Sequence, residues 1–421
     1  MSQLTNEKYD PYAVLRVRDF RFFLFTRFLL TLGFQMQTVI VGWQVYQITK
    51  NPLSLGLIGL AEALPFIASA LFAGHVADIV RRKLIIQFGI LVLFSCGLFL
   101  LFYSSSTDTV KLYGVLPIYI AIGFIGIARA FIHPSITAFI SQLVERNLYA
   151  NASTWNSTVW QIAAVSGPAL GGIIFGFFNA QVAFITSASL LFCSMILFSL
   201  INNKGIPTAK KQKESLATSL STGIKFVFSN KTILGALSLD LFAVLFGGAV
   251  ALLPVFASEI LLAGPEALGI MRAAPAFGAV LMAIIMAYFP PFKNAGRNML
   301  ICVASFGLCM ILFALSKNIY LSIFILALSG AVDNVSVVIR STIIQLLTPD
   351  EMRGRVSSVN SIFIGSSNEL GAFESGFAAK VLGLIPSVII GGCITMGVVG
   401  VTAKVAPALA QLNIDELQKN S

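Results

Sequence analysis

Residues 74–103 read GHVADIVRRKLIIQFGILVLFSCGLFLLFY, a polar turn with three consecutive basic residues followed by an apolar run. The run from Leu84 to Tyr103 contains no charged residue. Its length of about 20 residues is what a helix needs to cross a bilayer. This stretch therefore predicts a membrane-spanning helix that follows a short basic loop.

Similar apolar runs recur along all 421 residues, of which 57% are hydrophobic and only 11% charged. Soluble domains have roughly 25% charged residues, so this chain has too few charges to cover an ordinary globular surface. We expect an all-α polytopic membrane protein with twelve transmembrane helices. The predicted spans are 20–48, 53–77, 84–103, 113–140, 152–178, 180–202, 231–261, 265–289, 298–316, 319–346, 355–381 and 385–406.

Basic residues are distributed unequally between the connecting loops. Of the 28 Lys and Arg residues, the predicted outer loops contain only Lys50, Lys111 and Lys317. Because Lys and Arg collect at the cytoplasmic ends of membrane helices, both termini are predicted to be cytoplasmic. The net charge of +10 then needs no nucleic-acid partner to explain it.

The sequence indicates neither a metal site nor a set of disulfide bonds. The five cysteines are scattered through predicted spans, and the two histidines lack companions at metal-ligand spacing. We expect no metal and no cofactor.

The longest polar connection, 203–230, divides the predicted spans into six and six. Its second part has apolar residues at helical spacing, which is typical of an interfacial helix. We therefore expect an N-terminal bundle at 1–202, this linker, and a C-terminal bundle at 231–421.

A shift of 204 residues aligns parts of the two halves. It puts NASTWNS, 151–157, onto RVSSVNS, and it places Gly167 on Gly371 and Gly172 on Gly376. The agreement with the six-plus-six layout favours a duplicated six-helix unit.

The loop GHVADIVRRKL can form ion pairs between Asp78 and its basic cluster, or it can be an ordinary positive-inside loop. It resembles the loop signature of the major facilitator superfamily, although Ile79 and Arg81 depart from the usual pattern. In that family the Asp latches the cytoplasmic ends of the two halves, a role that the resemblance implies for Asp78. The matching residues are Gly74, Asp78, Arg82 and Lys83.

GPALGG, 167–172, resembles the antiporter motif of the same superfamily, which occurs mainly in exporters. Close helix packing explains the same small residues equally well. The matching residues are Gly167, Pro168, Gly171 and Gly172.

Three further stretches, 240–261, 269–279 and 332–376, resemble the drug:proton antiporter branch that contains the enterobactin exporter and macrolide efflux proteins. The resemblance implies a two-bundle, proton-driven exporter of a bacterial inner membrane.

Charged side chains at mid-bilayer cost about 2.5–3.5 kcal/mol on insertion scales, so each is a candidate functional group. The 204-residue shift maps Arg129 onto Asp333, and the resemblance places both on a central cavity, where they could interact. Asp240 could exchange protons there or form a fixed pair with Arg272 or another base. The intramembrane candidates are Glu62, Arg129, Asp240, Arg272, Asp333, Arg340, Glu369 and Glu374. We assign the substrate or proton pathway to Gln35, Gln37, Arg129, Asp240, Asp333 and Glu369.

The stretch SSNELGAFESG, 366–376, contains two carboxylates five residues apart, about 140° around a helix. Because they cannot share one face, we assign Glu369 to conformational or proton coupling. Helix packing is assigned to Glu374 with Gly371 and Gly376.

Together with what the resemblance implies, these patterns predict a monomeric secondary transporter that exports a small amphiphilic organic molecule, such as a siderophore or a drug, by alternating access. An importer of the same fold is the main alternative. A membrane-bound enzyme is a second alternative, but the chain has no nucleophile elbow, phosphate loop or clustered metal ligands.

Overall fold

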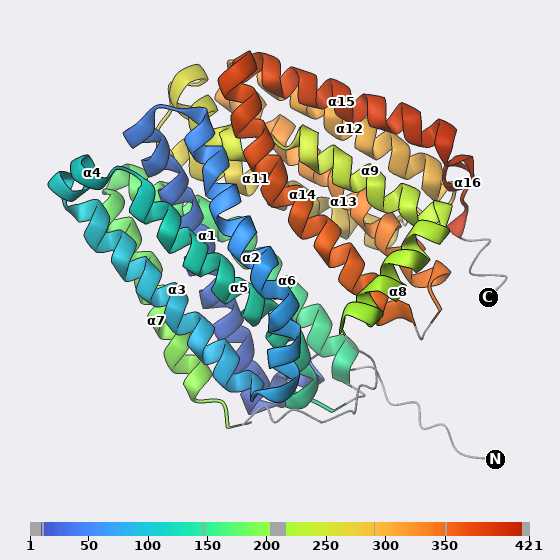
Figure 1. Cartoon of the computed structure of the whole chain (residues 1–421), viewed down its shortest axis with the longest axis horizontal. Helices are drawn as coiled ribbons and strands as arrows, with labels where there is room; N and C mark the ends of the chain where they lie inside the picture. The colour runs from blue at the N-terminus through green and yellow to red at the C-terminus, as the bar shows by residue number, and fades with distance from the viewer. Residues whose placement is uncertain are drawn as a thin grey trace.

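The computed structural model describes residues 10, 12–145, 148–202, 216–289, 291–349 and 352–414. Over these ranges the chain is helical and contains no strand. Figure 1 shows the helices in two groups, one from the first half of the chain and one from the second. At the boundary, α2 and α6 of the first group lie against α14 and α11 of the second. The first group comprises η1 (Ala13–Arg16), α1 (Arg18–Thr49), α2 (Pro52–Ile79), α3 (Arg82–Ser105), α4 (Thr107–Tyr113), α5 (Leu116–Leu143), α6 (Tyr149–Phe177) and α7 (Ala180–Ser199). The second comprises α8 (Leu216–Ser229), α9 (Lys231–Gly247), η3 (Ala249–Leu252), α10 (Leu253–Val255), η4 (Phe256–Ile260), α11 (Pro265–Tyr288), α12 (Ala295–Leu315), α13 (Ile319–Leu347), α14 (Arg353–Leu382), α15 (Leu384–Val405) and α16 (Pro407–Ala410).

Within the described residues, 11 helical segments have the length and composition to cross a membrane. Eleven of the twelve predicted spans correspond to them. The predicted span 355–381 forms helix α14, yet α14 is not among the 11. Its sequence is rich in Ser and Asn and contains Glu369 and Glu374, which lower its hydropathy.

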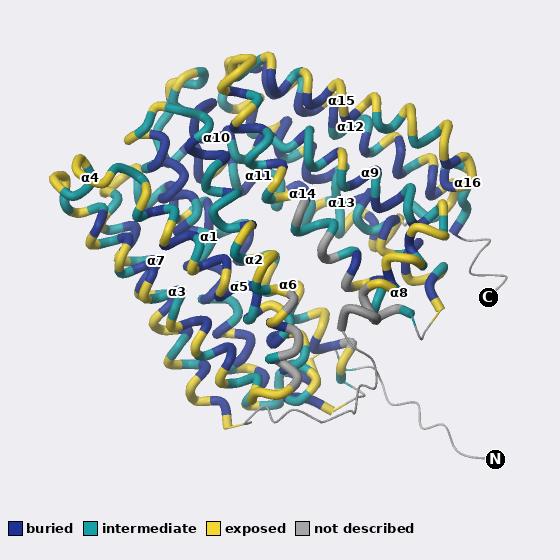
Figure 2. Tube along the Cα trace, viewed as in Figure 1, coloured by how far each residue is buried: buried dark blue, intermediate teal, exposed yellow. Residues whose placement is uncertain are grey.

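The outward faces of the helices are apolar and exposed. Phe102, Phe177 and Phe324 are 70%, 77% and 64% exposed. In Figure 2 buried and exposed positions alternate along α3, α12 and α15, so each of these helices has one face on its neighbours and one face outward. An outward face of this kind is stable against lipid chains and unstable against water.

The predicted continuous span 231–261 is interrupted in the structure. The helix α9 ends at Gly247, and the chain continues as the short elements η3, α10 and η4. A Cβ on Gly247 would lie 2.8 Å from Thr395 Oγ1, so the chain passes close to α15 here. At the break, the Ser375 hydroxyl of α14 donates a hydrogen bond of 2.9 Å to the carbonyl of Gly248, the residue between α9 and η3. Tertiary contact therefore stabilises a break that the apolar pattern does not reveal.

Two close crossings join the halves at one end of the molecule. A Cβ built on Gly172 of α6 would lie 2.5 Å from the Cα of Gly269 in α11, and one built on Gly376 of α14 would lie 2.7 Å from the Cα of Gly56 in α2. Only glycine permits such an approach between helix backbones. The Tyr46 hydroxyl of α1 adds a hydrogen bond of 3.0 Å to Glu259 of η4.

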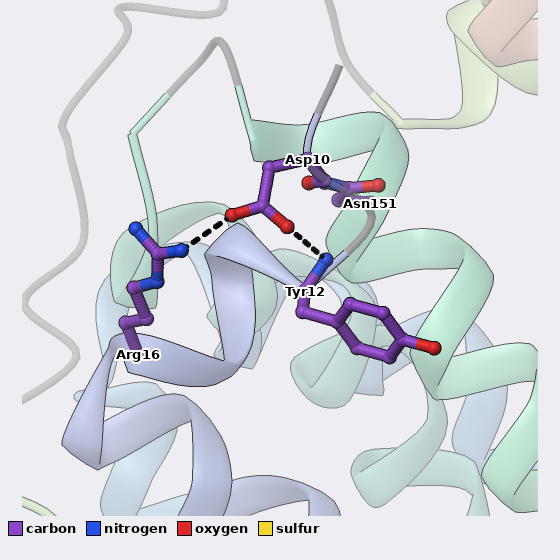
Figure 3. Close-up of polar contacts among 4 residues, drawn as sticks. All are labelled: Asp10, Tyr12, Arg16 and Asn151. Carbon is purple, nitrogen blue, oxygen red and sulfur yellow. Dashed lines mark hydrogen bonds and ion pairs between the residues drawn. The ribbon is translucent and has the colours of Figure 1, made fainter. Parts of the chain in front are cut away.

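The start of the described chain is fixed to α6. The Asp10 carboxylate accepts a hydrogen bond of 2.9 Å from the Tyr12 amide and pairs with Arg16 at 2.6 Å, as Figure 3 shows. The Asn151 amide of α6 donates to the Asp10 carbonyl at 2.9 Å. These contacts hold the segment before α1 against the first turn of α6.

Helix α8 occupies the second part of the predicted linker. It packs on α14, where a Cβ on Gly223 would lie 2.9 Å from the carbonyl oxygen of Arg355. Its location at a membrane surface stays a prediction.

Candidate functional site

A cavity of about 550 Å³ lies between the two groups of helices. Its walls come from α1, α2 and α5 on one side and from α9, η3, α11, α12, α13 and α14 on the other. Apolar side chains such as Ile122, Phe306 and Met310 alternate with polar ones. Five of the residues assigned to the pathway from the sequence line this cavity: Gln35, Gln37, Arg129, Asp333 and Glu369.

Arg129 of α5 links carboxylates from both halves. Its guanidinium forms an ion pair with Glu62 of α2 and lies 4.0 Å from the Glu369 carboxylate of α14. The ring of Phe34 lies 4.8 Å from the guanidinium carbon, a cation–π distance. Arg129 is therefore held by its own half while it faces a carboxylate of the other half.

The closeness of Glu62 to Arg129 depends on a glycine. A Cβ on Gly126 would collide with the backbone of Glu62, so the helices α2 and α5 touch at this level. Arg129 lies one turn farther along α5, next to the contact. No hydrogen bond or ion pair joins Arg129 to Asp333 in the described chain, although both line the cavity.

Asp240, the sixth residue assigned to the pathway, lies outside this cavity. It pairs with Arg340 of α13, and the two side chains are 10% and 5% exposed. Neither residue lines the cavity. The base that pairs with Asp240 is thus Arg340 rather than Arg272, in an arrangement that resembles a fixed structural pair.

Arg272 of α11 and Asp333 of α13 differ from Arg129 and Asp240 because they form no ion pair with a described residue. Both line the cavity, and neither has an ion pair or a side-chain hydrogen bond in the part of the chain that the structure describes. An atom placed as Cβ on Gly42 would lie 3.9 Å from Arg272 Nη1, so this guanidinium reaches across to α1.

The two glutamates of α14 occupy different surroundings. Glu369 faces the main cavity, whereas Glu374 lines a small void beside Gly248 and Val388. Gly371 packs against Val244 and Leu245 of α9, and Gly376 against Gly56 of α2.

The glycines of GPALGG also have distinct neighbours. A Cβ on Gly167 would meet Gln35, and one on Gly171 would meet Met36, both in α1. Gly172 instead contacts Gly269 of α11. Helix α6 is thereby packed on its own half and on the opposite half at once, while Pro168 lies inside it as a helix-interior proline.

The basic residues at the start of α3 donate hydrogen bonds to carbonyls of α5 and of the end of α7. Lys83 donates to the carbonyls of Ser199 and Ile201 at the end of α7, and Arg82 donates to the carbonyl of Ala138 at 3.2 Å. Because the last carbonyls of a helix lack intrahelical donors, Lys83 supplies a charged donor at the end of α7, whereas Ala138 lies five residues before the end of α5. The surroundings of Gly74 and the side chain of Asp78 lie outside what the structure describes. The latch expected at Asp78 therefore stays a prediction.

The sequence of this chain matches a known family over nearly its whole length. Residues 9–420 match the major facilitator family described as transmembrane secretion effector. The chain belongs to this family. It is a multi-pass membrane transporter, which confirms the resemblance found in the sequence.

Named relatives of this transporter are distant but cover most of its length. It is 22% identical to the multidrug efflux pump Tap of Mycolicibacterium fortuitum, over 98% of this chain and 99% of the relative. The enterobactin exporter EntS of Citrobacter koseri is 23% identical, over 88% and 92% of the two chains. The staphyloferrin A transporter of Staphylococcus aureus is 22% identical, over 89% and 94%.

Solved structures show the same fold. A transporter of the POT family, crystallised with a thioalcohol-conjugated peptide, superposes with a TM-score of 0.74, 13% identity and coverage of 93% of this chain and 96% of the other. A bacterial homologue of the lysosomal transporter Spinster, in an inward-facing and unoccupied conformation, gives 0.68, 14%, 96% and 98%.

From the sequence, Glu62 of this transporter is an intramembrane candidate without a specific role, and Arg272 is a possible partner of Asp240. Both were visible as ionisable residues inside predicted spans, which was the available signal. Their neighbours come from helices distant in sequence, so only the folded chain shows that Glu62 pairs with Arg129 and that Arg272 lines the cavity.

Proposed function

We propose that this transporter is a proton-coupled exporter of a small amphiphilic organic molecule, and that it works by alternating access across a bacterial inner membrane. The proposal includes α14 as a twelfth transmembrane helix, two six-helix bundles, cytoplasmic termini and a monomer. The relatives named as an efflux pump and as a siderophore exporter support the direction.

The observation that carries the proposal is the cluster of Glu62, Arg129 and Glu369 between the two halves. It contains two carboxylates and one guanidinium, so binding one proton makes it neutral. A group of this kind favours a proton when its surroundings are dry and releases it when they are wet. Because Glu369 belongs to one half and Arg129 to the other, movement of the halves changes the surroundings of both.

The cavity also fits the type of cargo. Its volume of about 550 Å³ falls in the range of about 300–1,000 Å³ of small-molecule sites. Apolar walls with a few charged groups suit a molecule that has an apolar body and polar ends. The glycine contacts close one end of the boundary between the halves, which supports an occluded or one-sided cavity in this state.

Transport in oriented membrane vesicles tests the proposal. In inverted vesicles acidified inside, the exporter should accumulate a fluorescent amphiphile such as rhodamine B, and a protonophore should abolish the accumulation. Vesicles without the protein give the baseline. Uptake only in right-side-out vesicles would support an importer and overturn the proposed direction.

A further inference from the structure

The charges that line the cavity do not all compensate one another. Arg129 has Glu62 as a partner and Glu369 beside it. Arg272 and Asp333 face the same cavity without an ion pair to each other or to any described residue. Glu369 also interacts electrostatically with Arg272, although the two form no ion pair, whereas Asp333 has no such interaction with a described residue. Both side chains are half-buried, and a charge in such surroundings costs free energy unless it has a close partner. The lack of a close partner at Arg272 and at Asp333 therefore requires an explanation.

The register of α11 and α13 places these two charges at different depths. The helices run in the same direction because the single helix α12 connects them. Their backbones cross where Gly330 meets Pro275. Arg272 lies three residues before this crossing and Asp333 three residues after it, a separation along the helices of about 9 Å at 1.5 Å per residue.

The two ends of the cavity can therefore be assigned. The Arg272 guanidinium lies beside Gly42 of α1, one helical turn from Tyr46, whose hydroxyl bonds to Glu259 at the closed end. Asp333 lies on the opposite side of the crossing. Apolar wall residues, among them Leu326 and Met310, also line the cavity.

We propose that Arg272 and Asp333 form a two-point subsite for a zwitterionic cargo, with the anionic group of the cargo at Arg272 and its cationic group at Asp333. An anionic cargo would leave Asp333 without a counter-charge, and a cationic cargo would leave Arg272 with only the more distant Glu369, which it shares with Arg129. A cargo with both charges, separated by an apolar body, pairs with each residue and leaves the net charge of the cavity unchanged. This inference rests on the proposed function because it names the cargo class of that same cavity.

The guanidinium of Arg272 is suited to binding a carboxylate of the cargo. A guanidinium presents its donors in a planar fork that matches the two oxygens of a carboxylate. Asp333, as an acceptor, binds an ammonium or a delocalised cation.

Direct binding to the purified, full-length transporter tests the subsite with three dyes of one scaffold. Rhodamine B has a carboxylate and a cation, its ethyl ester has only the cation, and fluorescein has only negative charge. Fluorescence polarisation gives each Kd at a pH where the carboxylate of rhodamine B is ionised. We expect the wild-type protein to bind rhodamine B more tightly than either other dye.

Charge variants then assign the two contacts. Arg272→Gln should weaken rhodamine B binding by about ten-fold, the loss of one charge-assisted hydrogen-bonded contact. It should not weaken binding of the ester, which has no carboxylate for Arg272 to bind. Asp333→Asn should weaken binding of rhodamine B and of the ester by similar factors. Arg272→Lys should recover part of the preference, because the charge returns without the planar fork.

Several results would overturn the proposal. They are equal affinity of the wild-type protein for rhodamine B and its ester, no rhodamine B binding at all, or equal weakening of both dyes by Arg272→Gln. Binding is measured without a proton gradient. The export proposal can therefore fail in vesicles while the dye preference is observed. Equally, transport can be observed in vesicles while the dye preference is absent.

Discussion

Gly172 of α6 and Gly269 of α11 lie against each other across the boundary between the halves, and a Cβ built on Gly269 would come within 2.8 Å of the Cα of Gly172. The same contact recurs between Gly376 and Gly56. The two partners belong to matching sequences, since Gly56 follows Pro52 and Gly269 follows Pro265 with the same spacing. The halves are thus closed at one end by two equivalent contacts.

The first prediction concerns this closure. Gly172→Ala should shift the carrier away from the state described here, because the added methyl group meets the backbone of α11, and overpacking of this kind costs about 1–3 kcal/mol. Spin labels at the exposed positions Leu112 and Leu262 should report longer distances in the variant. Gly397→Ala is the matched control, since nothing lies within 4 Å of its Cβ position. Identical distance distributions in the two variants would contradict the prediction.

The second prediction concerns proton coupling. Glu369→Gln should leave the protein folded but remove the part of rhodamine B transport that depends on the pH gradient, because the cluster around Arg129 loses its second carboxylate. Initial rates in vesicles with and without a gradient measure the effect. Glu374→Gln is the control on the same helix, as Glu374 lies outside the main cavity. Gradient-driven transport at the wild-type rate in Glu369→Gln would exclude Glu369 as the coupling residue.

The third prediction concerns the pair of Asp240 and Arg340. Asp240→Asn leaves the buried Arg340 guanidinium without a counter-charge, so we expect a loss of about 3–5 kcal/mol of stability. Denaturation of the detergent-solubilised protein measures it. The double variant Asp240→Leu with Arg340→Met should be more stable than the single variant, because both charges are removed together. A single variant as stable as the wild type would show that the pair is unnecessary for stability.

The fourth prediction concerns the end of α7. Lys83→Met should destabilise the protein by about 1.5–3 kcal/mol, because the carbonyls of Ser199 and Ile201 lose a charged donor. Lys83→Arg should retain most of the stability. Thermal unfolding of the two variants in the same detergent makes the comparison. If Met and Arg at this position gave the same melting temperature, the hydrogen bonds would have no measurable role.

Much of the architecture was predictable from local pattern. Apolar runs of bilayer length located eleven of the spans that the structure contains, since hydropathy is a property of each segment alone. The interruption at Gly247 and Gly248 was not predictable. It depends on α14 and α15, whose atoms approach the broken segment only in the folded chain.

The candidate site, like the fold, was predictable from the sequence only in part. The apolar runs alone show that carboxylates and guanidinium groups lie within membrane-spanning segments, because a charge inside such a run is visible in the sequence however the run packs. Which groups become partners depends on the packing of the helices. This packing paired Asp240 with Arg340, joined Glu62 to Arg129 and left Arg272 and Asp333 facing the cavity. Ion pairs form over a few ångströms, and the packing of helices far apart in sequence sets those distances.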